Sequence, residues 1–103
     1  MVYTEYTRFA WDARKARSNV VKHGVPFELA ITVFDDPFAL LAGDDSHSTA
    51  GETREWIIGE SDHGVLVVVF TRRERGEVCR LISARKASRR ERRRYESAKG
   101  IPI

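Results

Sequence analysis

The chain is poor in the residues that would cross-link it or carry it through a membrane. Its 103 residues contain one cysteine, Cys79, which excludes an internal disulfide and with it the disulfide-stapled scaffolds of small secreted proteins. The longest apolar run, Val65–Phe70, is much shorter than the roughly 20 residues that a membrane helix needs. The first residues, Met1–Phe9, resemble neither a signal peptide nor a transit peptide. We therefore expect a single cytoplasmic domain that spans residues 1–103.

Sequence signatures of cofactor and metal sites are missing as well. The chain has no Gly-rich phosphate loop and no dinucleotide-binding fingerprint. Its three histidines are scattered and give no zinc-binding spacing. The acidic pairs Asp35-Asp36 and Asp44-Asp45 fall in or near predicted loops, where such pairs commonly end helices. We expect no cofactor and no metal, and we expect Cys79 in the core or on the sheet surface rather than as a nucleophile.

Basic residues are concentrated in the C-terminal third. Residues 72–103 carry 12 lysines and arginines against 4 acidic residues, whereas residues 1–71 carry 6 against 11. Ten of the 12 are arginines, which suit bidentate phosphate contacts and stacking on bases. This charge distribution favours a polyanionic partner such as nucleic acid. The alternative is a solvated helix face with a docking site for an acidic protein.

A first helix is predicted over Ala13–Val21, after a short strand over Val2–Phe9. Asp12 is a suitable N-cap, and Gly24 favours the end of the helix. Helical spacing divides the side chains between two faces. The expected apolar face consists of Trp11, Ala16 and Val20, and the expected polar face of Lys15, Asn19, Lys22 and His23.

A second helix is predicted after Pro26, which suits a first helical turn, and it ends at Asp35-Asp36-Pro37. Its apolar stripe consists of Phe27, Ala30, Val33 and Phe34. Three later segments predict strands, at Thr53–Gly59, Gly64–Arg72 and Val78–Arg85. Phe38–Ala42 carries a fainter strand pattern that is not counted in the order.

The C-terminal segment opens with Ser88-x-x-Glu91, a capping-box pattern that predicts a helix to about Ala98, before Gly100. The expected order is β-α-α-β-β-β-α, and the fold class is α+β. Two N-terminal helices would pack on an antiparallel sheet, with a basic helix at the C-terminal end. Val65–Phe70 is apolar on both faces and should form a central strand.

The turns predict a register for the last three strands. If Arg73 pairs with Glu77, Phe70 lies opposite Arg80, and if Glu60 pairs with Val65, Phe70 also lies opposite Glu55. One face would then hold Glu55, Phe70, Arg72 and Arg80. The other would hold Trp56, Ile58, Val67, Val69 and Leu81, with Arg54 and Arg85 near its ends. We expect this second, apolar face to meet the two early helices, although a one-residue slip would exchange the sets.

The remaining polar side chains are arginine, lysine, histidine, tyrosine and glutamate. These suffice for metal-independent cleavage of RNA, in which a 2′-hydroxyl attacks the neighbouring phosphate. Cations stabilise the charge on the phosphoryl oxygens, and a lysine, histidine or tyrosine moves the protons. The same side chains suit simple binding of RNA or of a protein, so residue types alone leave both functions open.

Three ordered blocks of sequence resemble the BrnT family of type II toxins. The first runs from Phe9-Ala10-Trp11-Asp12 through Lys22-His23-Gly24-Val25 to Val33-Phe34-x-Asp36, and the second includes Gly51-Glu52-x-Arg54 and Val67–Thr71. The third is Ile82-Ser83-Ala84-Arg85-x-Ala87-Ser88-x-x-Glu91-Arg92-x-x-Tyr95. The resemblance covers nearly the whole chain. It departs at Ala10, where an acidic residue is common, and is weak over Asp44–Ala50.

The resemblance implies a RelE/ParE-like fold and a ribonuclease that arrests growth by cutting RNA. It also implies a small ribbon-helix-helix antitoxin, BrnA-like, that neutralises the toxin. The complex would bind operator DNA through the antitoxin. We expect the antitoxin to cover the basic residues 72–95, because an acidic segment there would block RNA at the same time.

The resemblance also implies roles for individual residues at matched positions. Arg54 and Arg85 would be phosphate or transition-state cations, and Glu91 would orient Arg85 or Arg92. Lys22 and His23 would transfer protons or position RNA, although His23 also suits a helix-end cation. Tyr95 would stack on a base or donate a hydrogen bond. The RNA-binding candidates are Arg72, Arg80, Arg89 and Arg92, of which Arg72 and Arg80 come from the register alone and also suit a protected sheet edge.

Two classes of function follow from these observations. The first is a metal-independent endoribonuclease toxin, and it is favoured by the set of Arg54, Arg85, Glu91, Arg92 and Tyr95. The second is a non-cleaving toxin of the same RelE/ParE-like fold that poisons gyrase, or a module that binds RNA or protein, because a fold does not determine a function.

Overall fold

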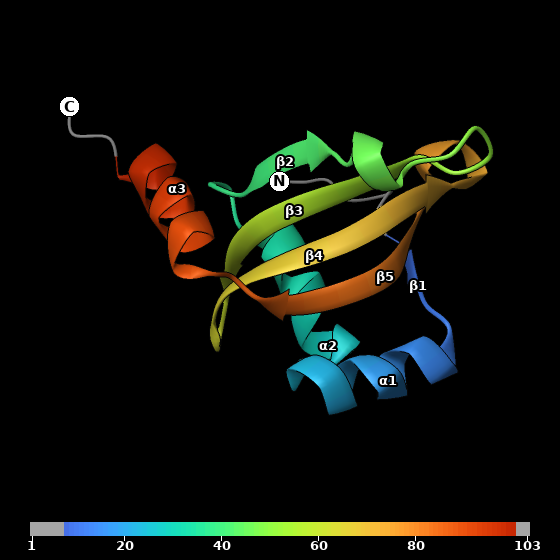
Figure 1. Ribbon diagram of the computed structural model, residues 1–103, viewed down its shortest axis with the longest axis horizontal. Coiled ribbons are helices and arrows are strands. Elements are labelled where there is room, and N and C mark those ends of the chain that lie inside the picture. Colours follow the sequence, from blue (N-terminus) through green and yellow to red (C-terminus); the bar gives the residue numbers. More distant parts are fainter. Residues whose placement is uncertain (1–7, 101–103) are drawn as a thin grey trace.

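One mixed sheet of five strands forms the centre of the molecule, in the order β1-β5-β4-β3-β2 (Figure 1). The computed structural model describes residues 8–100. The strands are β1 (Arg8–Ala10), β2 (Leu40–Gly43), β3 (Arg54–Ser61), β4 (Gly64–Arg73) and β5 (Val78–Lys86). β1 pairs with β5 in the parallel direction, and the other neighbours are antiparallel.

The α+β class is confirmed. The structure differs from the predicted antiparallel β-α-α-β-β-β-α arrangement in two strands, β1 and β2. The sheet is not wholly antiparallel, because β1 and β5 lie far apart in the sequence and no hairpin sets their relative direction. The segment Phe38–Ala42, which was not counted, contributes most of the edge strand β2. The strand predicted over Val2–Phe9 overlaps β1 at Arg8 and Phe9, and its residues 2–7 lie outside the described residues.

The predicted boundaries of the first helix are confirmed at its start and close to its end. Helix α1 (Ala13–His23) follows Asp12, whose carboxylate accepts hydrogen bonds from the backbone N–H groups of Arg14 at 2.8 Å and Lys15 at 3.1 Å. Gly24 ends the helix with φ 70°, a left-handed conformation that glycine adopts without steric cost.

The other two α-helices begin close to their predicted starts. Helix α2 (Phe27–Ala30) follows Pro26 but continues as the 3-10 helix η1 (Ile31–Asp35) rather than as one regular helix. Helix α3 (Arg89–Lys99) begins with the predicted capping box between Ser88 and Glu91. Two further 3-10 helices are η2 (Asp45–His47) and η3 (Glu74–Gly76). None of the described helices is long and apolar enough to cross a membrane.

Helices α1, α2 and η1 cover one face of the sheet, and β4 lies at its centre as predicted (Figure 1). The core beneath these helices includes Phe27, Ala30, Val33, Ile57, Leu66, Val68, Phe70, Leu81 and Ala84. The prediction that the face of Trp56, Ile58 and Val67 meets the early helices is wrong. Both faces of β4 are apolar, so alternation did not indicate which of them the helices cover.

The predicted pairing of β3 with β4 is confirmed, since Glu55 lies opposite Phe70. The predicted pairing of β4 with β5 is wrong, since Phe70 lies opposite Leu81 and not Arg80. A bulge in β5 leaves Ile82 between the paired residues Leu81 and Ser83. It returns Arg85 to the face of Trp56, where it was predicted, and leaves Leu81 in the helix-covered core.

Asn19 is the buried residue of α1, although its position predicted a polar, exposed face. Its side-chain amide donates to the carbonyl of Val25 at 2.9 Å and to that of Ala84 at 2.7 Å. Its side-chain oxygen accepts from the Ala84 N–H at 3.0 Å. Val20, predicted on the apolar face, is exposed. Asn19 therefore bonds α1 to β5 at Ala84, the residue before Arg85.

Helix α3 packs against the opposite side of the sheet through Tyr95. The Tyr95 side chain is buried with Ile58 and Val67, and its hydroxyl donates a hydrogen bond to Asp36. Lys99 adds an ion pair with Glu60, at 3.0 Å. These contacts hold the basic helix at one end of the sheet (Figure 1).

Candidate active site

The face of the sheet opposite α1 and α2, here called the open face, carries a cavity of about 300 Å³. Alternation along the paired strands places on this face Arg54, Trp56 and Ile58 of β3, Val67, Val69 and Thr71 of β4, and Arg80 and Arg85 of β5. The cavity is lined by Asp44, His47, Trp56, Ile58, Val67, Val69, Arg85, Glu91 and Arg94. Apolar side chains thus form its floor and charged side chains its walls.

Arg85 and Glu91 join the last strand to the C-terminal helix at the wall of this cavity. Two guanidinium N–H groups of Arg85 donate to the two carboxylate oxygens of Glu91, at 2.8 and 2.9 Å. The same carboxylate accepts from the Ser88 N–H at 2.8 Å as part of the capping box. Because a bidentate pair fixes the plane of a guanidinium, the carboxylate of Glu91 holds the Arg85 side chain in one orientation.

These contacts determine the protonation of both groups. Hydrogen bonds from Arg85 and then from Ser88 lower the pKa of Glu91 from its ordinary 4.5 to about 2. The hydrogen bond to Glu91 also raises the pKa of Arg85. At neutral pH the pair is therefore a fixed cation beside a carboxylate that does not accept a proton.

The lowered pKa of Glu91 predicts an acid-sensitive contribution to stability. Because the folded-state pKa lies below the unfolded-state value, the contribution is complete above pH 4.5 and is lost as the pH falls toward about 2. The difference in unfolding free energy between the wild type and Glu91→Gln should therefore shrink over this interval. Urea denaturation of both proteins at several pH values measures it, and a difference that stays constant with pH would contradict the assignment.

Two further predicted cations lie on the open face in one row across the sheet. Thr71 of β4 has Arg54 opposite it on β3 and Arg80 opposite it on β5. Arg54 donates from Nε to Glu52 at 3.1 Å, and Arg73 donates to the other oxygen of the same carboxylate at 3.1 Å. The row lies beyond the cavity, toward the end of the sheet away from α3, and extends the basic surface along β4.

Lys22 and His23 lie outside the cavity, at the end of α1. With Lys15, Ser18 and Asn19 they line a separate hollow of about 220 Å³ that also touches Ile82 and Ser83 of β5. The structure therefore does not bring these two side chains together with Arg85 and Glu91. They lie beside β5 near Ser83, which precedes Arg85 by two residues.

Tyr95 is held in the interior, with 1% of its surface exposed. Burial and the hydrogen bond to Asp36 raise the pKa of its hydroxyl. Of its two predicted roles, the structure contains the hydrogen bond, and the buried ring has no open surface for a base. Tyr95 thus anchors α3 to the sheet and to Asp36.

Arg72 is separated from the other arginines, so the prediction that it shares a face with Arg80 is wrong. It lies on the helix-covered side, with its guanidinium 5.5 Å from the ring centre of Phe70. It donates to the Glu55 carboxylate at 2.7 and 3.3 Å. Arg73 pairs with Val78 and not with Glu77, and this one-residue shift at the turn places Arg80, but not Arg72, on the open face.

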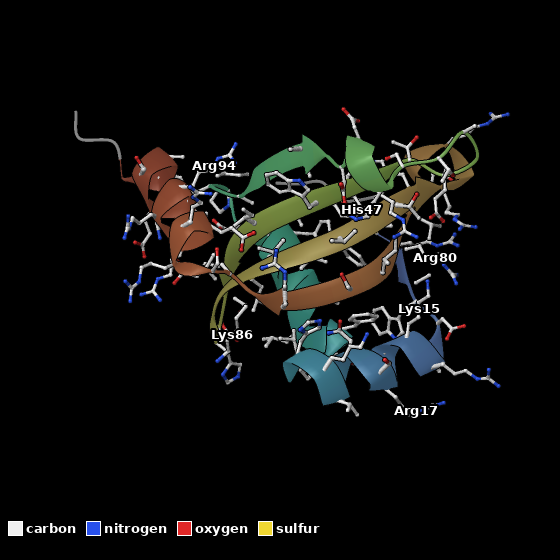
Figure 2. All side chains as sticks on the ribbon, in the orientation of Figure 1. Lys15, Arg17, His47, Arg80, Lys86 and Arg94 are labelled. Carbon is white, nitrogen blue, oxygen red and sulfur yellow. The ribbon has the colours of Figure 1, made fainter. Side chains whose placement is uncertain are left out.

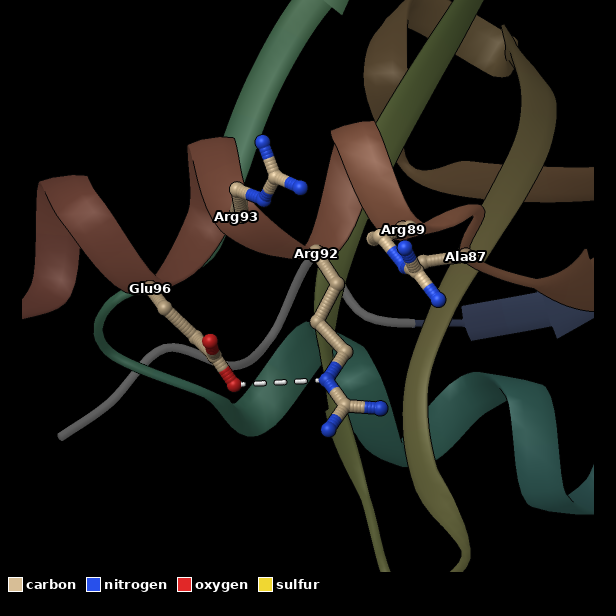
Figure 3. Close-up of a pocket in the computed structure, with 5 residues that line it drawn as sticks. All are labelled: Ala87, Arg89, Arg92, Arg93 and Glu96. Atoms are coloured by element: carbon tan, nitrogen blue, oxygen red, sulfur yellow. Dashed lines mark hydrogen bonds and ion pairs between the residues drawn. The ribbon is translucent and has the colours of Figure 1, made fainter.

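Arg89 and Arg92 line a second hollow, of about 430 Å³, with Ala87, Arg93 and Glu96 (Figure 3). Arg92 donates to Glu96 at 3.3 Å. Arg94 belongs instead to the open-face cavity, where its guanidinium lies 5.9 Å from the ring centre of Trp56. The arginines of α3 therefore line two different surfaces. Five arginines within six helical positions cannot all lie on one face of the helix.

Arg94 and the pair Asp44–His47 are cavity residues that sequence reasoning missed. Figure 2 labels Arg94 on α3 and His47 on η2, which reach the cavity from different sides. The spacing of Asp44 and His47, three residues apart, was a usable signal, but the segment has no periodicity and matched the toxin family weakly. Arg94 was hidden within the arginine run.

The described residues contain no group of three histidine, cysteine or carboxylate side chains that could hold a metal ion. Cys79 is part of the helix-covered core, one of its two predicted placements. Burial raises the pKa of its thiol.

Comparison with known proteins identifies the family. The curated proteins contain no match. A family model described as "ribonuclease toxin, BrnT, of type II toxin-antitoxin system" matches residues 11–91, from Trp11 just before α1 to Glu91 in the first turn of α3. The match thus contains every cavity residue except Arg94. The chain belongs to the BrnT family of ribonuclease toxins.

Proposed function

We propose that this chain is a metal-independent endoribonuclease that cuts RNA on the open face of its sheet and so arrests growth in the cytoplasm. The 2′-hydroxyl of one nucleotide would attack the adjacent phosphate, giving a 2′,3′-cyclic phosphate and a 5′-hydroxyl. Arg85 would stabilise the charge that develops on the phosphoryl oxygens. Glu91 would be a positioning residue, and Tyr95 would act through the placement of α3.

The observation that carries this proposal is the oriented guanidinium of Arg85 in a cavity with an aromatic floor. Glu91 fixes two of its N–H groups at 2.8 and 2.9 Å, so a phosphate meets a cation that needs no reorganisation. Trp56 lines the same cavity and offers a surface on which a base can stack. Metal independence is supported by this wall of cations, because guanidinium groups neutralise phosphate without a metal ion.

The other candidate residues would extend the RNA path beyond the cavity. Arg54 and Arg80 flank Thr71 and would hold backbone phosphates on one side. Lys22 and His23 would position RNA at the neighbouring hollow beside β5. Arg89 and Arg92 would contact it on the outer side of α3. Arg72 has no part in this path, since it lies on the other face.

Type II toxins work with an antitoxin, and membership of this family therefore implies an antitoxin partner for this chain. We propose a ribbon-helix-helix antitoxin, BrnA-like, whose acidic segment covers the open face and the basic residues 72–95. Operator DNA would be bound by the complex through the antitoxin. The proposed RelE/ParE-like character of the fold is consistent with early helices on one face of the sheet and a basic terminal helix.

The proposal predicts RNA cleavage in the presence of EDTA. The purified chain, incubated with a defined RNA and EDTA, should yield fragments that end in 2′,3′-cyclic phosphate. A single 2′-deoxy substitution at the cut position should abolish cleavage there, because it removes the attacking oxygen. Gel separation and end-group analysis measure both results.

Cleavage of the deoxy-substituted RNA at the same position would contradict the 2′-hydroxyl mechanism. Absence of cleavage of free RNA would direct the test to RNA on the ribosome. If that RNA also stayed intact, the alternative of a non-cleaving toxin that acts on gyrase would be preferred.

A further inference from the structure

A histidine and an aspartate form a pair at the wall of the cavity. Nδ1 of His47 lies 3.1 Å from each carboxylate oxygen of Asp44. Asp44 is mostly shielded, with 18% of its side chain exposed, whereas His47 has 68% exposed. The carboxylate thus holds one ring nitrogen, and the ring itself stands at the surface of the cavity that Arg85 and Glu91 also line.

The segment that carries this pair is attached to β3 by hydrogen bonds. The Asp44 N–H donates to the Arg54 carbonyl at 2.8 Å, and the Arg54 N–H donates to Oγ of Ser48 at 2.9 Å. Oγ of Ser48 in turn donates to the Asp44 carbonyl at 2.8 Å. These bonds place His47 at a defined position over the open face rather than on a free loop.

The other charged groups of the cavity are poorly suited to accept a proton. Glu91 has a pKa of about 2 because Arg85 and Ser88 donate hydrogen bonds to it. The hydrogen bond to Glu91 raises the pKa of Arg85, and a guanidinium group has no acceptor atom. Tyr95 is buried and bonded to Asp36. His47 supplies the imidazole that lines this cavity, and a neutral imidazole has one ring nitrogen that accepts a proton.

We propose that His47 is the general base of the reaction, oriented by Asp44. This inference rests on the proposed ribonuclease function. Nε2 takes the proton of the 2′-hydroxyl as the 2′-oxygen bonds to phosphorus and the bond between phosphorus and O5′ breaks. O5′ receives a proton from water, and the resulting hydroxide takes the proton back from the imidazolium. Asp44 holds the ring through Nδ1 and stabilises the imidazolium that forms.

The test compares His47→Gln and His47→Ala with the wild type in single-turnover cleavage at saturating protein. Removal of the base should lower the rate by about 100-fold or more. Binding of an RNA with a 2′-deoxy substitution at the cut position should stay unchanged, because the base acts in the chemical step. Added imidazole should restore part of the rate to His47→Ala and none to Arg85→Ala.

His63→Gln is the matched control, because His63 is an exposed histidine that lines a different hollow with Leu66 and Lys86. It should cleave at the wild-type rate. Wild-type cleavage by His47→Gln would overturn the inference, as would a rate loss matched by an equal loss of RNA affinity. If the wild type itself cuts no RNA, the proposed function fails, and this result is distinct from failure of the base assignment.

Discussion

Arg85→Ala should lower the rate of RNA cleavage by about 1,000-fold, the scale expected when one donor to the developing charge is lost. The substitution removes the guanidinium that Glu91 orients toward the cavity. The fold should survive, because 42% of the Arg85 side chain is exposed and partly exposed ion pairs contribute little stability. Single-turnover cleavage and a urea titration of the same protein separate the two effects.

Two control variants make this prediction specific. Arg85→Lys keeps the charge but not the planar fork, so it should recover only part of the rate. Arg90→Ala removes an exposed arginine of α3 that the proposed RNA path does not include, and it should cleave nearly as well as the wild type. Equal activity of Arg85→Ala and Arg90→Ala would show that the open-face cavity has no part in the mechanism.

Asn19→Ala should destabilise the protein by about 3 kcal/mol, because it leaves buried backbone groups without their partners. The Asn19 side chain satisfies two carbonyls, those of Val25 and Ala84, and the N–H of Ala84. Alanine supplies none of these bonds and also leaves a small cavity. The midpoint of urea unfolding measures the change.

Ser18→Ala is the control for this prediction, since Ser18 is an exposed neighbour on the same helix. It should change the unfolding free energy by less than about 0.5 kcal/mol. A loss of under about 1 kcal/mol in Asn19→Ala would show that water or a shifted backbone replaces the lost partners. The prediction would then fail, together with the role of Asn19 as the fastener of β5.

The sequence predicted the parts of the fold that depend on local geometry. Asp12 and Ser88 cap helices where their side chains reach backbone N–H groups within three residues. The register of β3 against β4 followed from the short turn that joins them. Local steric and hydrogen-bonding rules determine these features, because each of them involves residues that are neighbours in the sequence.

Features that depend on distant contacts were predicted less well. Asn19 has a polar side chain at a buried position, because its partners lie on β5 and a helical pattern does not contain them. The bulge at Ile82 changes the register of β5 against β4 by one residue between Leu81 and Ser83, and no turn residue signals it. The cavity was predicted only in part, for a similar reason. Arg85 and Glu91 are close in sequence, whereas His47 is distant in sequence and lines the same cavity only because the chain folds into the sheet.

The central claim, that RNA binds on the open face, has a direct test in the two tryptophans. Trp56 lines the cavity, with Arg94 over its ring at 5.9 Å. Trp11 packs edge-on against Phe27 on the helix-covered side, with ring centres 5.8 Å apart. The experiment is an NMR titration of the two indole N–H signals with an RNA that carries a 2′-deoxy substitution at the cut position.

The account predicts that the RNA shifts the Trp56 signal and leaves the Trp11 signal in place. Arg85→Ala should weaken this response, whereas Arg90→Ala should retain it. A shift of Trp11 with an unmoved Trp56 would place the RNA on the other side of the sheet and would contradict the account.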